Sequence, residues 1–254
     1  FHLSTLMVPA QRQALLREIR QRLKVGLPCR VVSTSLIEAG VDVDFPAVYR
    51  ELAGLDSVLQ AAGRCNREGK RTAEESIVTI FERTELPPLL FRTAVGAARE
   101  ALAGDRDPGA PETMRRYFDA LRGLSGEALD KSGVVKAFQT GIEGCAMPFR
   151  TVAERFHLID ENTRTVYIPF GGGAALAEQL KAGECSRELY RKLGRYAVAV
   201  YEPHFQKLYA AGALLTARQV PALDPDSAIL SDMTLYSKAT GLSLEPETGK
   251  AVMI

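Results

Sequence analysis

Two arginines in the sequence QAAGRCNREGK have the type and spacing that can bind phosphate. Arg64 and Arg67 stand three residues apart just after a predicted helix, so both side chains can point in a common direction, with Gln60 on the same side one turn earlier. A guanidinium can bind a phosphate through two hydrogen bonds, and it can neutralise charge that develops on a transferred phosphoryl group. The alternative is a solvated basic turn, because Lys70 and Arg71 follow immediately.

A second polar group lies in the sequence VVSTSLIEAGVDVDFP. A predicted strand ends at Ser33 and Thr34, whose hydroxyls can hydrogen-bond a phosphate oxygen. Gly40 lets a backbone approach a ligand closely, and Asp42 can accept a hydrogen bond from a ribose hydroxyl. The alternative is structural, since Ser33 and Thr34 can cap a helical turn and Asp44 can begin the next turn.

The elements that must position these residues alternate between helix and strand. A helix is predicted over residues 9–24, with leucine and isoleucine at helical spacing, a proline at its start and a glycine after its end. The segments CRVVST, AVYREL and SIVTIF are predicted strands, and DSVLQAAG between the last two is a predicted helix. Such strands pair in parallel, so the loops after Leu3, Val32 and Arg50 should share one edge of a sheet.

The rest of the chain has a different pattern. Helices are predicted over residues 91–103 and 112–121, after the proline-marked boundary ELPPLL. Two strands around an Asp-Glu-Asn turn follow after residue 147, then a helix over 174–181 and a further helix, strand and helix; the segment after Pro221 is left open as strands or irregular structure. We expect an α/β chain: a partial parallel sheet with flanking helices, a helical linker, and a small mixed α/β domain.

Composition excludes several classes of protein. The 254 residues carry a net charge of +1, so nucleic-acid binding would need a local basic patch. No apolar run is long enough for a membrane span, and no signal-peptide pattern occurs. The chain begins with Phe1 in a strand-like segment, which indicates a fragment that starts inside a folded unit. Widely spaced cysteines favour reduced thiols and argue against a zinc site; they are Cys29, Cys65, Cys145 and Cys185.

Together the two polar segments resemble motifs V and VI of superfamily 2 helicases, whose second RecA-like domain ends in Q-x-x-G-R-x-x-R. The closer similarity is to the CRISPR-associated helicase-nuclease of type I interference systems, where matching segments occur in this order and near this spacing. The matching segments here are residues 3–5, 38–46, 48–57 and 60–69. Cys65 and Asn66 are more specific to this family than to helicases in general. The resemblance is strong over residues 3–81, and a weaker one extends into RTVAERFHLIDENTRTVYIPFG, which is similar to that family's C-terminal accessory domain.

The resemblance implies a role for each residue at a nucleotide. Motif VI would comprise Gln60, Gly63, Arg64 and Arg67. Arg67 would be the arginine finger, and Arg64 a second phosphate or interdomain contact. Asp42 would approach the ribose of ATP or the coupling network, with Gly40 providing clearance.

The same resemblance implies a DNA track. Ser4, Thr5 and Thr34 would contact the phosphate backbone of a single strand, which grips DNA without reading its bases. The helix over residues 9–24 is rich in arginine and could face DNA, although a solvated amphipathic face is the alternative.

Other parts of a motor are absent from the sequence. No G-x-x-x-x-G-K-[ST] motif occurs, and the glycines from Gly171 are interpreted as a flexible turn. His2, His157 and His204 are isolated and cannot form the histidine-aspartate metal cluster of the family's nuclease. The chain would thus hold half of an ATP site, with ATP and Mg²⁺ bound mainly by a first RecA-like domain outside it. Alone, it should be inactive.

The implied protein is an ATP-dependent DNA helicase that moves 3′ to 5′ on single-stranded DNA and degrades invader DNA in CRISPR interference. Its expected partners are single-stranded DNA, a CRISPR surveillance complex, and the first RecA-like and nuclease domains of the same protein. No membrane partner is expected, and the expected location is the cytoplasm. The expected domains are a second RecA-like domain (1–86), a helical linker (87–146) and an accessory domain (147–254). Two alternatives stay open: a stand-alone non-catalytic docking module of the same system, or part of another superfamily 2 helicase.

Overall fold

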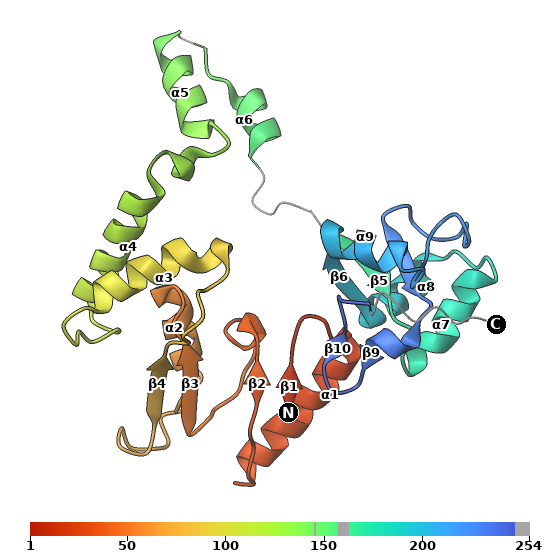
Figure 1. Ribbon diagram of the computed structural model, residues 1–254, viewed down its shortest axis with the longest axis horizontal. Coiled ribbons are helices and arrows are strands. Elements are labelled where there is room, and N and C mark those ends of the chain that lie inside the picture. The colour runs from red at the N-terminus through yellow and green to blue at the C-terminus, as the bar shows by residue number, and fades with distance from the viewer. Residues whose placement is uncertain (145, 157–162, 247–254) are drawn as a thin grey trace. The chain divides into compact units, whose positions relative to one another are not determined.

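The computed structural model describes residues 1–144, 146–156 and 163–246 (Figure 1). The chain divides into two compact units. The first unit contains Phe1–Val43 together with Glu161–Ile254, and the second contains Asp44–Asp160. The expected α/β class is confirmed, with parallel strand pairs, a helical stretch and a small mixed sheet.

The first unit opens with a short parallel strand pair joined by a long helix. Strand β1 (His2–Leu3) pairs with β2 (Val32–Ser33), and α1 (Pro9–Lys24) connects them. The predicted helix and the parallel pairing are confirmed here. The strand predicted in CRVVST is reduced to two residues, since its partner β1 is only two residues long. A 3₁₀ turn, η1 (Ser35–Ile37), follows β2.

The remainder of the first unit is a four-stranded mixed sheet in the order β6-β5-β8-β7. Its interior strand β5 (Thr163–Tyr167) is antiparallel to β6 (Ala197–Tyr201) and parallel to the other interior strand, β8 (Ser227–Leu230). Successive residues of β5 serve different cores, because Val166 packs in one hydrophobic cluster and Tyr167 in another. The other elements are α7 (Gly172–Lys181), α8 (Arg187–Leu193), η3 (Gly194–Tyr196), α9 (Glu202–Ala210), β7 (Leu214–Leu215), η4 (Met233–Leu235), β9 (Tyr236–Ser237) and β10 (Gly241–Leu242).

Several predictions in this region are now resolved. The helix, strand and helix expected after residue 186 are present as α8, β6 and α9. The segment left open after Pro221 forms β8 and the β9–β10 hairpin. The first of the two strands predicted around the Asp-Glu-Asn turn falls on residues 157–162, and lies outside the described residues, as does His157. Gly171, with a φ of +56°, is the N-cap residue of α7, so the glycine-rich segment forms the start of a helix and not only a turn.

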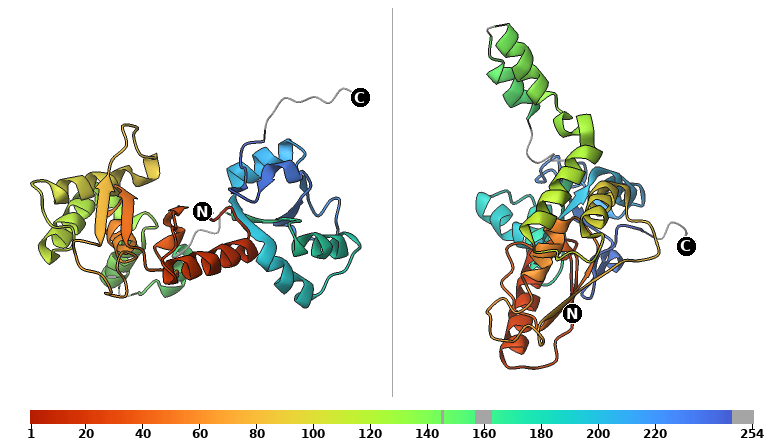
Figure 2. Two further views of the ribbon diagram at one scale, coloured as in Figure 1. Left: turned by 90° about the horizontal axis from the view of Figure 1, so that it is seen from below. Right: turned by 90° about the vertical axis from the view of Figure 1, so that its left-hand side faces the viewer.

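The second unit contains a two-stranded parallel sheet and a series of helices. Strand β3 (Ala47–Glu51) pairs with β4 (Ile77–Phe81), and α2 (Leu55–Ala62) connects them. The core joins α2 to two helices that lie side by side in Figure 2, α3 (Leu89–Leu102) and α4 (Pro111–Ser125). The remaining elements are η2 (Gly126–Asp130), α5 (Val134–Glu143) and α6 (Phe149–Arg155).

A partly buried hydrogen bond anchors α4 to the start of α2. The Tyr117 hydroxyl donates to Asp56 Oδ1 at 2.9 Å, and Tyr117 is 2% exposed. Asp56 lies in the first turn of α2, where a carboxylate is also favoured by the helix dipole. Gly54 makes room for this contact, since a Cβ there would lie 2.6 Å from both the Asp56 carboxylate and the Tyr117 hydroxyl. The helix that leads to the two arginines is therefore held by α4.

We expect Tyr117→Phe to reduce the free energy of unfolding by about 1–2 kcal/mol at pH 8, because it removes a hydrogen bond to a carboxylate. Burial, and then the hydrogen bond to Asp56, raise the pKa of Tyr117 to about 12. The contribution of Tyr117 is thus complete below pH 10 and falls as the pH rises from 10 towards 12, because the unfolded chain ionises first. Urea unfolding should show that the free energies of unfolding of mutant and wild type differ less at pH 11 than at pH 8. Tyr49→Phe, at a 73% exposed position, is the control and should leave the free energy of unfolding unchanged at both pH values.

Candidate functional site

The two arginines lie on a loop that follows α2, and this loop (residues 63–71) is called the arginine loop below. The backbone leaves the helix in a tight turn, with Arg64 N bonded to Ala61 O at 3.0 Å and Cys65 N to Ala62 O at 2.8 Å. The chain then forms a parallel bridge between Cys65 and Phe45, in which Phe45 N donates to Arg64 O at 2.9 Å. The start of the arginine loop is therefore fixed on both sides by backbone hydrogen bonds.

Asn66 closes the arginine loop at its base. Its side-chain amide donates to Arg71 O at 2.8 Å and accepts from Arg71 N at 2.9 Å, an arrangement that mimics a strand pair. Its backbone has a φ of +47°, a conformation that asparagine tolerates better than most residues. Gly69 N bonds to Asn66 O at 2.9 Å inside the loop. Arg67, which is exposed, thus sits on a closed loop of defined shape.

Ion pairs engage the other basic residues of the arginine loop. Arg71 Nη1 lies 2.9 Å from Asp44 Oδ2, and these side chains are only 26% and 14% exposed. Lys70 forms an ion pair with Glu68. The simple alternative of a solvated basic turn therefore does not describe Arg71, whose charge is used to hold the loop.

Cys65 has a structural place in the loop. Its thiol lies 3.5 Å from Pro46 O, just before β3, and 3.8 Å from Ile77 O, the first residue of β4, which links the arginine loop to the start of both strands. Burial raises the pKa of Cys65, although Arg71 acts in the opposite direction. The thiol is thus kept protonated, as a structural rather than a reactive cysteine.

The structure brings the predicted residues of motif VI together at one helix end. Gln60, Gly63 and Arg67 are exposed, and Arg64 is half-buried. Gly63 has a φ of −63°, and a Cβ there would meet only backbone oxygens at an ordinary 3.5 Å. The fold therefore does not demand glycine at this position. The role of each residue stays a prediction.

In the first unit, the predicted DNA-contacting residues lie at the carboxyl ends of β1 and β2. Thr34 N donates to Leu3 O at 3.1 Å, so the two parallel strands end at the same edge. Thr5 and Thr34 are exposed there. Ser4 differs, since it is 5% exposed and its hydroxyl donates to Thr240 O at 3.4 Å and accepts from Leu6 N at 3.3 Å.

Gly40 and Asp42 lie on the exposed turn after β2. Gly40 has a φ of +70° and no atom within 4 Å of a Cβ, so its conformation needs glycine and the space beside it is open. The backbone carbonyl of Asp42 accepts a 2.8 Å hydrogen bond from Arg20 Nε of α1. Arg22 of the same helix pairs with Glu18 at 3.3 Å. Part of the arginine-rich face of α1 is therefore used inside the protein.

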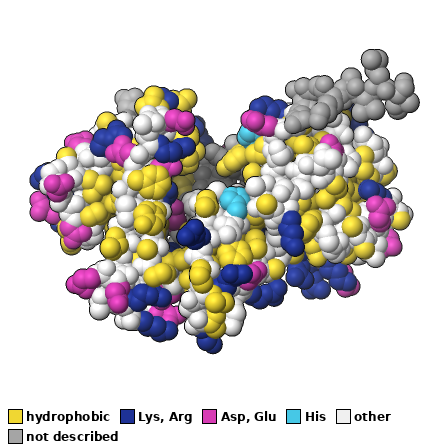
Figure 3. All heavy atoms as spheres, turned by 60° about the horizontal axis from the view of Figure 1, so that its bottom comes forward, with side chains coloured by type: hydrophobic (Ala, Val, Ile, Leu, Met, Phe, Trp, Pro, Cys, Tyr) yellow, Lys and Arg dark blue, Asp and Glu magenta, His cyan; other side chains and the backbone are white. Residues whose placement is uncertain are grey.

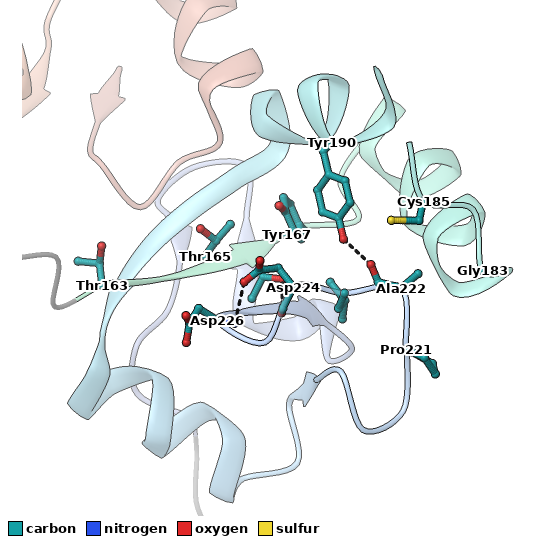
Figure 4. Close-up of a pocket in the computed structure, with 12 residues that line it drawn as sticks. Thr163, Thr165, Tyr167, Gly183, Cys185, Tyr190, Pro221, Ala222, Asp224 and Asp226 are labelled. Carbon is teal, nitrogen blue, oxygen red and sulfur yellow. Dashed lines mark hydrogen bonds between the residues drawn. The ribbon is translucent and has the colours of Figure 1, made fainter. Parts of the chain in front are cut away.

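A separate cavity of about 870 Å³ lies in the four-stranded part of the first unit (Figure 4). Thr163, Thr165 and Tyr167 share one face of β5 along its wall, and Asp224 and Asp226 supply carboxylates. Burial, followed by Tyr190 and Asp224, raises the pKa of Tyr167 to about 12. Arg164 pairs with Asp226 at 3.1 Å, and the Asp224 carboxylate disfavours a phosphate beside it. None of the residues predicted from the sequence lines it.

The surface view in Figure 3 shows acidic and basic side chains interspersed with apolar ones, in keeping with the net charge of +1. Among the described residues, no group of three or more histidines, cysteines, aspartates or glutamates is placed to hold a metal ion. Within the same part of the chain, no helix is both long and apolar enough to cross a membrane.

Sequence reasoning missed Asp44 and Arg71 as parts of the site, and it noted Asn66 only as a family feature. A signal for Asn66 exists: asparagine is enriched at positive φ, and here it precedes a glycine three residues later in a turn-like segment. The pairing of Asp44 with Arg71 spans 27 residues and depends on the parallel bridge. No local pattern could have shown it.

Comparisons with known proteins agree with the resemblance found in the sequence. Residues 2–70 match the family model described as "CRISPR-associated nuclease/helicase Cas3, C-terminal". A protein of that name, CRISPR-associated nuclease/helicase Cas3 of Haloferax volcanii, is 41% identical over an alignment of 124 residues; the match covers 38% of this chain and 13% of the relative. The resemblance to the C-terminal part of this helicase-nuclease is therefore confirmed.

Solved structures show a similar fold. The T. fusca Cas3 structure covers 91% of this chain and 32% of its own, with a TM-score of 0.53 and 17% identity. The T. fusca structure described as Cas3-ATP matches with a TM-score of 0.52 and 16% identity, covering 91% of this chain and 32% of its own. The chain thus spans about a third of these structures and a smaller part of the curated relative.

Proposed function

We propose that this chain, which resembles the C-terminal part of a CRISPR-associated helicase-nuclease, is the helicase portion that supplies the arginine-finger half of an ATP site. The observation that carries the proposal is the arginine loop, which presents Arg67 on a closed, exposed turn while Asp44 and Asn66 hold Arg71 at its base. In the intact protein Arg67 would neutralise charge on the γ-phosphate, with Arg64 as a second contact.

The remaining nucleotide contacts would come from both this chain and another domain. Gly40 offers open space beside the backbone, and Asp42 is exposed close to it. These features suit the ribose and phosphates of ATP, and Gln60 and Gly63 complete motif VI. Mg²⁺ would be held by residues of a first RecA-like domain, since this sequence has no lysine-containing phosphate loop. By itself the chain should not hydrolyse ATP.

The proposal extends to the nucleic acid and to partners. Thr5 and Thr34, exposed at one strand edge, would contact the phosphates of a single DNA strand, as a translocating motor needs. The intact protein would degrade invader DNA after recruitment by a CRISPR surveillance complex. Residues 1–86, 87–146 and 147–254 would be its second RecA-like domain, linker and accessory domain.

A cytoplasmic location is part of the proposal, and free thiols at Cys29, Cys65 and Cys185 suit it.

ATP hydrolysis by the intact protein tests this function. We expect single-stranded DNA to stimulate turnover strongly and single-stranded RNA of the same length to stimulate it much less. Equal stimulation by RNA would favour another superfamily 2 helicase. No turnover with either nucleic acid would favour a non-catalytic docking module. Magnesium-dependent turnover by this chain alone would contradict the half-site assignment.

A further inference from the structure

The β9–β10 hairpin (residues 236–242) contacts the short loop between β1 and α1 (residues 4–8), more than 200 positions away in sequence. Leu242 N donates to Leu6 O at 2.9 Å, and Thr240 O accepts from the Ser4 hydroxyl at 3.4 Å. Both segments lie in the first unit, with the hairpin beside the start of α1 in Figure 1. The hairpin therefore holds the backbone of the loop directly.

Tyr236 of the hairpin also ties the loop to the first turn of α1. Its hydroxyl accepts from Val8 N at 3.1 Å and donates to Gln11 Oε1 at 2.7 Å. Gln11 in turn donates through Nε2 to Lys238 O, back on the hairpin. Tyr236 and Gln11 are each 8% exposed, so these bonds are shielded from water and costly to lose.

Gly241 shows how close the two backbones are. A Cβ at this position would lie 2.5 Å from Leu6 O and 2.7 Å from Met7 N, and its φ of +87° already favours glycine. These contacts leave no room for a side chain between the hairpin and the loop. The fit depends on the absence of a side chain at residue 241, as well as on hydrogen bonds.

Ser4 and Thr5 are adjacent but differ in what they can contact. Ser4 is buried with its hydroxyl bonded to the hairpin and to Leu6 N, whereas Thr5 is exposed at the tip of the loop. A buried hydroxyl with two protein contacts is poorly placed to reach a phosphate, while an exposed threonine can do so. Ser4 can therefore affect ligand binding by fixing the position of the neighbouring Thr5.

We propose that the β9–β10 hairpin is a positioning element for the loop of residues 4–8: it fixes Ser4 and thereby presents Thr5 to the phosphates of a nucleic-acid strand. Ser4, Tyr236 and Gly241 are positioning residues, and Thr5 makes the contact. The proposal rests on the proposed function, because it assigns the loop to DNA. It also makes the C-terminal part of the chain a determinant of how tightly the motor grips its strand.

Tyr236→Phe in the intact protein is the main test, because it keeps the ring and removes the hydroxyl. We expect hydrogen–deuterium exchange of residues 4–8 to accelerate several-fold, and the DNA concentration for half-maximal ATPase stimulation to rise roughly 3- to 10-fold, as for a lost buried hydrogen bond. The KM for ATP should stay within about 2-fold of wild type, since only the grip on DNA changes. Tyr190→Phe is the control, because it removes a hydroxyl that bonds to Ala222 O elsewhere in the same unit. It should change neither the exchange of residues 4–8 nor the DNA concentration for half-maximal stimulation.

Gly241→Ala gives a second test with a matched control. Gly183 has a φ of +90°, similar to that of Gly241, but no atom lies within 4 Å of a Cβ there. Gly183→Ala thus introduces the same backbone strain without the collision with Leu6. Only Gly241→Ala should raise the DNA concentration for half-maximal stimulation.

Two results would overturn the proposal. One is unchanged exchange of residues 4–8 in Tyr236→Phe, which would mean that the hairpin does not hold the loop. The other is a normal DNA requirement in both Tyr236→Phe and Gly241→Ala, in a protein whose wild type is stimulated by DNA. Failure of the proposed function is a separate result, because then the wild type itself would show no DNA-stimulated ATPase.

Discussion

Replacing Arg67 with alanine in the intact protein is expected to reduce DNA-stimulated ATP hydrolysis on the order of 10³-fold or more, the contribution typical of an arginine finger. The guanidinium would neutralise charge on the transferred phosphoryl group, so its loss acts on the transition state more than on binding. Turnover should therefore fall while the KM for ATP and the affinity for single-stranded DNA change little. Arg67→Lys should also stay strongly impaired, because an ammonium cannot donate in the same planar, bidentate geometry.

Lys70→Ala is the matched control for Arg67→Ala, because it removes a positive charge from the same exposed turn. Lys70 pairs with Glu68, and we assign it no contact with the nucleotide. Its loss should change turnover by less than about 2-fold, as for an exposed ion pair. If Arg67→Ala kept normal turnover, the finger assignment would be wrong; if both mutants lost activity equally, the effect would be one of general charge. Thermal unfolding of each mutant separates these outcomes from a loss of folding.

The helix α1 illustrates what local sequence can predict. Its apolar spacing, its first-turn proline and the glycine beyond its end each point to the same bounds, and Pro9–Lys24 is the helix observed. Strands β3 and β4 were predicted for a similar reason, because β-branched runs alternate with a helix that requires a parallel crossover. The helix end that carries Arg64 follows from the same pattern.

Contacts between distant segments could not be predicted from the sequence. Tyr236 and Gln11 are 225 residues apart, and nothing in either segment indicates that they meet. Ser4 is buried against the same hairpin, where its hydroxyl donates to Thr240 O, so a residue that sequence alone assigns to a ligand is bonded inside the protein. Spacing along the chain identifies which residue types are present at an edge. It does not decide which of two neighbouring hydroxyls faces outward.

Asn66→Ala should reduce DNA-stimulated ATP hydrolysis roughly 10- to 100-fold, although Asn66 makes no contact with the nucleotide in our proposal. The mutation removes both side-chain hydrogen bonds to the Arg71 backbone and places alanine at a φ of +47°. The arginine loop would then open at its base, and a displacement of a reacting group by about 1 Å can cost up to 10²-fold in rate. The free energy of unfolding should fall by about 1–3 kcal/mol. Steady-state kinetics with urea unfolding measures both effects.

Two further substitutions divide the effect of Asn66 into its physical causes. Asn66→Gly loses both side-chain hydrogen bonds to Arg71, but glycine adopts the positive φ without strain. Asn66→Asp keeps the oxygen that accepts from Arg71 N and loses only the donor to Arg71 O. We expect turnover to rise from alanine through glycine to aspartate, and to stay below wild type in all three.

Asp105→Ala controls for strain alone, because Asp105 is the other described non-glycine residue with a positive φ, at +52°, in an exposed turn between α3 and α4. It should lower stability slightly and leave ATP turnover unchanged. Equal losses of turnover in Asp105→Ala and Asn66→Ala would mean that stability sets the rate. Normal turnover in Asn66→Ala would mean that Arg67 does not need a closed loop. A selective loss in the Asn66 series would instead show that the asparagine of this motif acts by holding the arginine loop closed.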